Sequence, residues 1–270
     1  MESIKFTISV VLLTIVVFVC SSVHAAPQAE SLQFWDDSEP SSGLTPNHLR
    51  WQKLLDKFVI TVHPSGIHRV DYDAFSAADE KELRGYLAYL QQLDPRQLNK
   101  QRQKAYWLNL YNATMVLIVV VAQPSESIRS VDRKKLWVAE RFSIAGQKLS
   151  LDNIMHGILR PLFKDERIHF ALNLTTLGSA DINPLAYTGD NVEELIDQAA
   201  RDFLQQPRAV DFSDDELILS RLFYWYESDF GSNLTELKNY LKQYQSPDIV
   251  EKIEASKGVD YQYDWSLNKP

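Results

Sequence analysis

The chain has 270 residues, of which 45% are hydrophobic and 24% are charged. This balance is ordinary for a globular protein with a substantial buried core, and it excludes a disordered or fibrous chain. The formal net charge of -8 and the sequence pI near 5.3 argue against a general nucleic-acid binder, because such a protein needs a basic face that neutralises phosphates.

The N-terminal segment has the pattern of a targeting signal. Lys5 precedes the apolar run FTISVVLLTIVVFVC, and small residues follow in SSVHAAPQ. This order predicts a signal peptide over residues 1–25, cleaved after Ala25, and a periplasmic or secreted protein. The alternative is an uncleaved membrane anchor formed by residues 6–23, since that run approaches the roughly 18 residues that span a bilayer. We expect contact with a membrane only through this segment.

The single cysteine, Cys20, lies inside the same segment. Val19 precedes it, whereas lipid attachment in bacteria requires a small residue there, so Cys20 is not interpreted as a lipoprotein cysteine. Cleavage leaves the mature chain without a thiol, in a compartment where disulfides can otherwise form. Thiol catalysis, disulfides and cysteine-ligated metal are therefore excluded for the mature chain.

Residues 26–46 are rich in Ser, Pro, Asp and Glu, a composition that predicts an exposed arm, disordered or extended. Residues 47–268 are predicted to form a single globular domain, because the sequence has no internal repeat and no long linker. Helices are predicted over 48–60 and 76–93, the second beginning at Ser76. A turn and a short strand over 63–75 separate them.

Residues 101–124 have the strongest helical pattern in the chain. Residues 115–122 are apolar all round, which indicates a helix buried in the protein centre. Asn109 and Asn112 lie three residues apart on this helix and need partners, because an unpaired buried polar group costs about 1 to 3 kcal/mol. They are predicted either to clamp neighbouring backbone or to line a cavity.

Two histidines follow in the next segments. A hairpin with its turn at 145–146 is predicted first, and then a helix that carries His156, runs to Arg160 and is capped by Ser150 or Asp152. The segment ERIHFALNL, residues 166–174, alternates in polarity and predicts a strand. His169 on this strand is either the base of a site or a hydrogen-bonded core histidine.

The C-terminal third is predicted as a helix over 191–207, a hairpin over 208–220 with its turn at 213–216, and helices over 221–231 and 234–244. The fold class that follows is α+β, a small antiparallel or mixed sheet packed by several helices in a single domain. A doubly wound parallel sheet requires regular alternation of strands and helices, which the sequence does not show. The aromatic run 223–226 is interpreted as core rather than as a surface for stacking a sugar.

Five blocks of the sequence together resemble one known family. They are QKAYWLNLYNA, AGQKLSLDNIMHGILRP, DERIHFALNLTTLGSADINPLAY, LILSRLFYWYESDFG and VDYQYDWSLN, and they are similar to landmark blocks of the domain-of-unknown-function family five hundred and forty-seven. The similarity covers roughly residues 47–268, and several ordered blocks are more specific than any single motif. Bacterial members are exported proteins without a settled activity, so the resemblance implies a fold more firmly than a function.

The chain departs from the family pattern at positions that carry chemistry. Members typically have a Glu-His pair in the helix and a Cys-Ala-Ser-x-Gly-Cys-Pro loop after the second histidine. Matched residue by residue, the Glu is Met155 and the two cysteines are Leu174 and Ser179, whereas His156 and His169 are retained. The resemblance therefore implies a degenerate thiol-type site, in which the nucleophile and its expected orienting acid are both lost and one histidine remains as the base.

Two functions remain open. The first is a non-catalytic, pseudoenzyme-like exported module that keeps the pocket and binds a small ligand or a protein partner. The second is a hydrolase or transferase in which His169 acts with Ser179, or with a metal held by His156, His169 and an acid such as Asp181. A serine is a weak nucleophile without a placed base and oxyanion hole, and the separation of the histidines matches no known ligand spacing. The first function is therefore favoured.

The candidate remnant catalytic residues are His169, His156 and Ser179, and the candidate binding residues are Asn109, Asn112, Arg160 and Asn173. No metal site and no cofactor is predicted, since the sequence has no glycine-rich phosphate loop and no nucleotide motif. No nucleic-acid partner is expected. The helix with the asparagines and the two segments with the histidines are expected to converge, because their polar side chains need shared partners.

Overall fold

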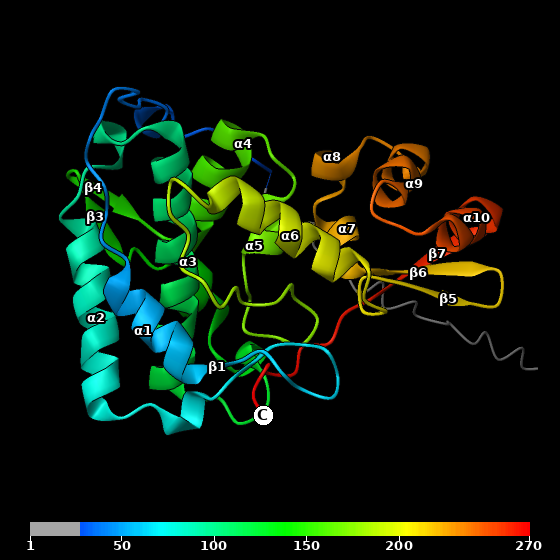
Figure 1. The fold of residues 1–270 in the computed structure, drawn as a ribbon, viewed down its shortest axis with the longest axis horizontal. Helices are drawn as coiled ribbons and strands as arrows, with labels where there is room; N and C mark the ends of the chain where they lie inside the picture. Colours follow the sequence, from blue (N-terminus) through cyan, green and yellow to red (C-terminus); the bar gives the residue numbers. More distant parts are fainter. Residues whose placement is uncertain (1–27) are drawn as a thin grey trace, which may run out of the picture.

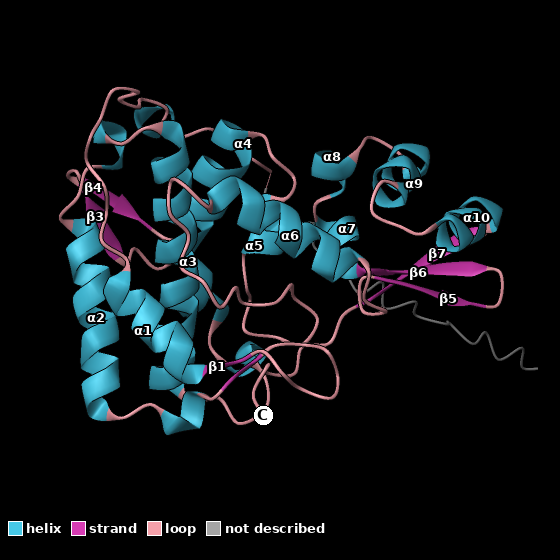
Figure 2. Ribbon diagram, viewed as in Figure 1, coloured by secondary structure: helices cyan, strands magenta, loops and turns pink. Residues whose placement is uncertain are grey.

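Helices account for most of the regular structure in the computed structural model, which describes residues 28–270 (Figures 1 and 2). The predicted signal peptide, residues 1–25, lies outside the described residues. Within the described range the strands form three small sheets. The predicted α+β class is confirmed, but three separate small sheets take the place of the one that was expected.

The bounds of the helices are as follows. Helices α1 to α5 span Leu49–Phe58, Ala77–Gln91, Lys100–Ala122, Arg160–Phe163 and Ile168–Ala171. Helices α6 to α10 span Val192–Leu204, Arg221–Trp225, Glu227–Phe230, Leu234–Lys242 and Pro247–Ala255. Short 3-10 helices cover Gln33–Trp35, Tyr72–Ala74, Pro95–Gln97 and Ile128–Ser130. Two π-helices, η5 and η6, cover Lys134–Val138 and Asn153–Leu159.

The strands pair in three groups. Strands β1 (Val59–Ile60) and β2 (Arg69–Val70) are antiparallel, as are β3 (Phe142–Ile144) and β4 (Gln147–Leu149). In the third sheet β6 (Glu216–Ser220) pairs antiparallel with β5 (Val210–Ser213) and parallel with β7 (Gly258–Gln262). Both predicted hairpins are confirmed, whereas the parallel strand β7 was not predicted.

Helix α3 forms the centre of the fold. Figure 1 shows it between α1 and α2 on one side and α4 to α6 on the other. It is the one described helix that is long and apolar enough to cross a membrane, and 83% of its most apolar window is buried inside the protein. The prediction of a buried central helix is confirmed, and its apolar surface is explained by the helices that pack around most of it.

Helix α2 begins where the sequence predicts. The hydroxyl of Ser76 accepts the backbone N–H of Asp79, and the carboxylate of Asp79 accepts the backbone N–H of Ser76. This reciprocal capping box satisfies two backbone donors that a helix start leaves unpaired. The local signal was therefore sufficient to place this helix end.

Residues 28–46 differ from the exposed arm that their composition predicts. Most of their side chains are exposed, but Trp35 is only 1% exposed. Its ring meets the ring of Trp107 on α3 edge to face, with 5.1 Å between the ring centroids. The tryptophan therefore ties this segment to the core.

The same segment also pairs with the π-helix η6. The backbone N–H groups of Glu30 and Leu32 donate to the carbonyls of His156 and Gly157, at 3.0 and 2.8 Å. A Cβ atom on Gly157 would lie 2.7 Å from the side chain of Leu32, so a larger residue there requires the Leu32 side chain to move. The two hydrogen bonds join the segment 28–46 to η6.

The segment predicted as a strand carrying His169 is not a strand. Residues Ile168–Ala171 form the single helical turn α5, and the chain becomes extended only at Leu172. All residues from Ile168 to Asn173 are buried. The alternation in sequence therefore does not separate a core face from a solvent face, because both kinds of side chain lie inside the protein.

Candidate functional site

The side chain of His169 is buried and paired with an acid. It is 2% exposed, and its Nε2 lies 2.7 Å from Oδ2 of Asp229 on α8. Burial opposes ionisation of Asp229, but hydrogen bonds from His169 and Arg160, together with the charge of Arg160, outweigh burial and lower the pKa of this carboxyl. A carboxylate can only accept a hydrogen bond, so Nε2 of His169 carries a proton and donates it.

The second ring nitrogen of His169 is the unusual one. Burial lowers the pKa of His169, and Arg160 adds to this effect while Asp229 opposes it, so the ring is neutral near pH 7. With its proton on Nε2, the ring presents a lone pair at Nδ1. That atom is buried and has no hydrogen-bond partner within residues 28–270. The pair thus has the base and the acid of a catalytic triad, with no nucleophile at the free nitrogen.

Arg160 connects the two histidines through the same acid. Its Nε and Nη2 donate to the two oxygens of Asp229 at 2.6 and 2.8 Å, a bidentate pair. Its Nη1 lies 2.9 Å from Nδ1 of His156. A guanidinium can only donate, so Nδ1 of His156 accepts and the ring carries its proton on Nε2. Burial, followed by the charge of Arg160, lowers the pKa of His156 to about 3.

The ring of Tyr226 packs against one side of this network. Its ring stacks on the ring of His169 with 4.2 Å between the centroids. The guanidinium of Arg160 lies 4.9 Å from the centroid of the same ring, within the range of a cation–π contact. The network is therefore covered by an aromatic side chain that belongs to the run interpreted from sequence as core.

Met155 lies among hydrogen-bond donors. The hydroxyls of Tyr226 and Tyr111 point at its Sδ at 3.6 and 3.9 Å. A thioether is a weak acceptor, and burial raises the pKa of both tyrosines, so their hydroxyls keep their protons. The surroundings of residue 155 are suited to a stronger acceptor than the one that is present.

Ser179 is held within its own loop. Its hydroxyl donates to the carbonyl of Thr176 at 2.9 Å, and it accepts hydrogen bonds from Nδ2 of Asn173 at 3.2 Å and from the backbone N–H of Leu174 at 3.3 Å. In the described part of the chain no hydrogen bond links it to either candidate histidine. The structure therefore does not bring Ser179 and His169 together as a nucleophile and its base.

The two asparagines of α3 clamp backbone. Asn109 donates to the carbonyl of Tyr187 at 2.7 Å and accepts the N–H of the same residue at 3.1 Å. Asn112 donates to the carbonyl of Ala171 at 2.8 Å and accepts the N–H of Asn173 at 3.0 Å. Of the two alternatives that the sequence left open, the clamp is the one observed, because each amide already uses both of its ends.

The expected convergence is present for part of the set. Asn112 holds the backbone beside the turn that carries His169, and Arg160 joins His156 to Asp229. Asn109 bonds the backbone of Tyr187, and Ser179 bonds its own loop, residues 173–180, so neither joins this network. The site is therefore a network on η6, α4, α5 and α8 that Asn112 supports from α3.

Sequence reasoning missed Asp229, and it was wrong to treat the orienting acid of His169 as lost. The aspartate lies in the recognised block LILSRLFYWYESDFG, but only its aromatic residues were considered. A carboxylate in a block with many buried aromatics was an available signal, because a buried charge needs a partner. The identity of that partner required the fold.

The proposed metal ligands are not assembled. Within residues 28–270 no group of three His, Cys, Asp or Glu side chains is placed to hold a metal ion. Asp181 lies apart from both candidate histidines: its Oδ1 is 2.8 Å from Nη2 of Arg208 and accepts the backbone N–H of His68 at 3.0 Å. The geometry therefore offers no support for a site built from His156, His169 and Asp181.

Two cavities in the described structure lie away from the network. One, of about 400 Å³, lies between α2 and α3, and the other, of about 440 Å³, lies beside Gly178, Arg208 and Tyr263. The second adjoins the loop of Ser179 through Gly178. His156, Arg160, His169 and Asp229 line neither of them.

One family model matches part of the chain. The model of the family described as "Protein of unknown function, DUF547" matches residues 95–204. This segment contains α3, both histidines and the 173–180 loop, so the resemblance drawn from the sequence blocks is confirmed there. No curated protein and no solved structure gives a significant match to the chain. Asp229 lies C-terminal to the matched segment.

Proposed function

For a chain whose residues 95–204 match the DUF547 family, we propose a non-catalytic binding module with the remnant of a thiol-type site. The observation that carries the proposal is the state of His169. Its Nε2 donates to an acid at 2.7 Å, while its buried Nδ1 has no partner among the described residues. An oriented base without a nucleophile is the arrangement expected when a triad loses its first member.

The environment of Met155 supports the same proposal. Two buried tyrosine hydroxyls point at a thioether, at the position where the resemblance implies a glutamate in other members. A carboxylate would accept both hydrogen bonds far more strongly than sulfur does. The tyrosines thus retain an arrangement suited to a residue that this chain lacks.

The side chains of the histidine network now stabilise the fold. Hydrogen bonds link Arg160 and Asp229 to both histidines and join η6, α4 and α5 to α8, while Nδ1 of His169 has no partner among the described residues. The module binds a small ligand or a protein partner, rather than a nucleic acid, in keeping with its net charge of -8.

The alternative of a serine hydrolase or transferase is tested directly on the wild-type protein. A fluorophosphonate probe labels an activated serine, and we expect no adduct, because the Ser179 hydroxyl is bonded to its own loop and not to a histidine. Intact-mass and peptide mass spectrometry read out the result. A stoichiometric adduct on Ser179 that is lost in His169→Gln would overturn the non-catalytic proposal.

The remnant thiol site is tested by restoring a thiol. In a Cys20→Ser background, Leu174→Cys introduces the only cysteine, and Leu185→Cys is the matched control because Leu185 is 49% exposed on a nearby segment. We expect the labelling rate of Cys at 174 by iodoacetamide to rise at a lower pH than in the control, whose thiol has an ordinary pKa of about 8.5. Adding His169→Gln should abolish the difference. Identical pH profiles with and without His169 would show that the two positions are not coupled.

Export is part of the proposal and rests on residues 1–25. The protein is periplasmic or secreted, and its mature chain begins at Ala26. Intact-mass spectrometry of protein recovered from the periplasm or the medium measures the start of the chain. A mass that retains residues 1–25, with the protein in the membrane fraction, would favour an anchor formed by residues 6–23.

A further inference from the structure

The groove between α2 and α3 is mostly apolar. It has a volume of about 400 Å³, within the range of small-molecule sites. Its apolar walls are formed by Leu87, Leu117, Ile118, Val121, Val131 and Phe142. Thr114, the polar residue at its centre, uses its hydroxyl on the carbonyl of Leu110 in its own helix. The groove floor therefore presents hydrocarbon rather than free hydrogen-bonding groups.

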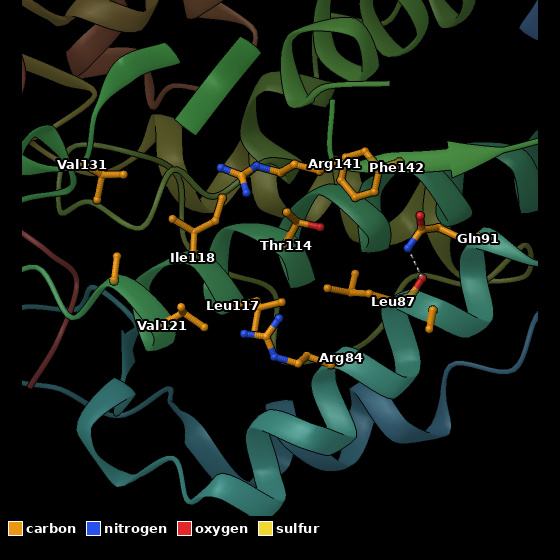
Figure 3. A pocket seen from close by; sticks show the side chains of 12 residues that line it. Arg84, Leu87, Gln91, Thr114, Leu117, Ile118, Val121, Val131, Arg141 and Phe142 are labelled. Carbon is orange, nitrogen blue, oxygen red and sulfur yellow. Dashed lines mark hydrogen bonds between the residues drawn. The ribbon is translucent and has the colours of Figure 1, made fainter. Parts of the chain in front are cut away.

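Two arginines border this apolar floor. Figure 3 shows Arg84 from α2 and Arg141 from the start of the β3 hairpin extending over the groove from opposite walls, with Thr114, Leu117 and Ile118 between them. Arg84 pairs with Glu80 one turn away, at 2.7 Å on the surface. An exposed pair of this kind contributes little and exchanges its partner readily.

Of the two arginines, Arg141 is the one whose positive charge has no acidic partner among the described residues. Its guanidinium donates to the backbone carbonyl of Lys135, and no ion pair with a carboxylate is found for it within residues 28–270. Burial by the surrounding protein lowers the pKa of its guanidinium. A cation beside an apolar surface with no acid of its own favours an anion as a ligand.

We propose that the α2–α3 groove binds a single-chain fatty carboxylate, with the hydrocarbon chain along Leu117, Ile118 and Val121 and the carboxylate between Arg84 and Arg141. The hydrocarbon chain of such a ligand matches the apolar side chains of the groove, and its carboxylate matches the two arginines. Apolar burial contributes about 25 cal/mol per Å², and a guanidinium bonds a carboxylate in a bidentate, charge-assisted manner. Thr114 lies about 200° around α3 from Asn112, so this site is separate from the histidine network and does not depend on the proposed function.

Decanoate is the probe, and isothermal titration calorimetry of the full mature chain measures its binding. We expect saturable binding that weakens about tenfold or more in Arg141→Gln, the loss of one charge-assisted interaction. Decanol has a similar chain without the charge, and its weaker binding should be unchanged by Arg141→Gln. If Arg141→Gln unfolds the hairpin, Arg84→Gln on an exposed helix face provides a second variant that removes a positive charge from the groove.

A matched pair of substitutions tests the location. Val121 in the groove is 52% exposed and Val62 outside it is 90% exposed, so glutamate at either position is compatible with folding. Val121→Glu should weaken decanoate binding by about tenfold or more through charge repulsion and lost apolar contact, whereas Val62→Glu should leave it unchanged. Absence of saturable decanoate binding, equal loss of decanoate and decanol in Arg141→Gln, or binding only to phosphatidylglycerol vesicles would each overturn the proposal.

Discussion

Nε2 of His169 lies 2.7 Å from Oδ2 of Asp229, although 60 residues separate the two in sequence. Arg160 donates to both oxygens of the same carboxylate, and it also reaches His156. One acid therefore compensates a buried guanidinium and orients a buried imidazole. Breaking a buried pair of this kind costs more than forming it contributes, because the remaining charge loses its partner.

Asp229→Asn should destabilise the protein by about 3 to 5 kcal/mol, because the substitution removes the carboxylate that bonds the buried Arg160 and His169. Urea unfolding followed by circular dichroism measures the change in the free energy of unfolding. Asp73→Asn is the control, since Asp73 is exposed and a surface substitution changes stability by about 0.5 kcal/mol or less. Similar losses in the two variants would contradict the central place of Asp229 in the network.

Stability should fall as the pH is lowered below about 6.5. Burial lowers the pKa of His48 to about 4 and that of His156 to about 3. The unfolded chain binds protons at these histidines below their ordinary pKa of about 6.5, whereas the folded chain does not. Each histidine therefore contributes stability that is present above about pH 6.5 and is lost toward its folded pKa, at up to about 1.4 kcal/mol per pH unit.

This slope is measured by urea unfolding between about pH 7.5 and pH 5, a range chosen to lie above the ordinary carboxyl pKa values. His48→Gln and His156→Gln should each flatten the dependence, whatever their effect at neutral pH. A wild-type free energy of unfolding that is constant across this range would show that the two histidines take up protons equally well in the folded state.

Trp35→Ala should cost about 3 to 5 kcal/mol, the loss typical of truncating a large buried aromatic side chain. Trp35 is 1% exposed and its ring packs on Trp107. Phe34→Ala is the matched control, because the neighbouring ring is 38% exposed and its removal should cost much less. The urea-unfolding midpoints of the two variants are compared. Equal midpoints would mean that this segment is not anchored to the core.

Asn112→Ala should destabilise the protein by roughly 2 to 6 kcal/mol. The substitution removes the amide from the buried N–H of Asn173 and from the carbonyl of Ala171, which keeps only the longer bond from the Tyr187 hydroxyl at 3.4 Å, at about 1 to 3 kcal/mol for each group. Asn239→Ala on the exposed face of α9 removes an asparagine from a helix without this cost. Chemical unfolding of the two variants side by side provides the test, and a small loss in Asn112→Ala would refute the clamp.

Local physics explains which parts of the fold the sequence predicted. The Ser76 capping box, the all-apolar run of α3 and the turn residues of the two hairpins act within a few residues, so their effect is readable without knowing what packs nearby. The sequence also shows His156 and His169, together with Met155, Leu174 and Ser179 at positions where the resemblance implies other residues. The sequence by itself thus determined the class of fold and the residue types of the candidate site.

Only the tertiary structure decided how those residues are used. The segment at His169 is a helical turn rather than a strand, and protein surrounds it, so the alternation in sequence does not mark an exposed face. Asp229 finds His169 and Arg160, and Trp35 finds Trp107, through contacts between distant segments. Such contacts depend on the packing of the whole chain, because many acids and aromatics of suitable type are available and no local pattern distinguishes the one that the fold brings near.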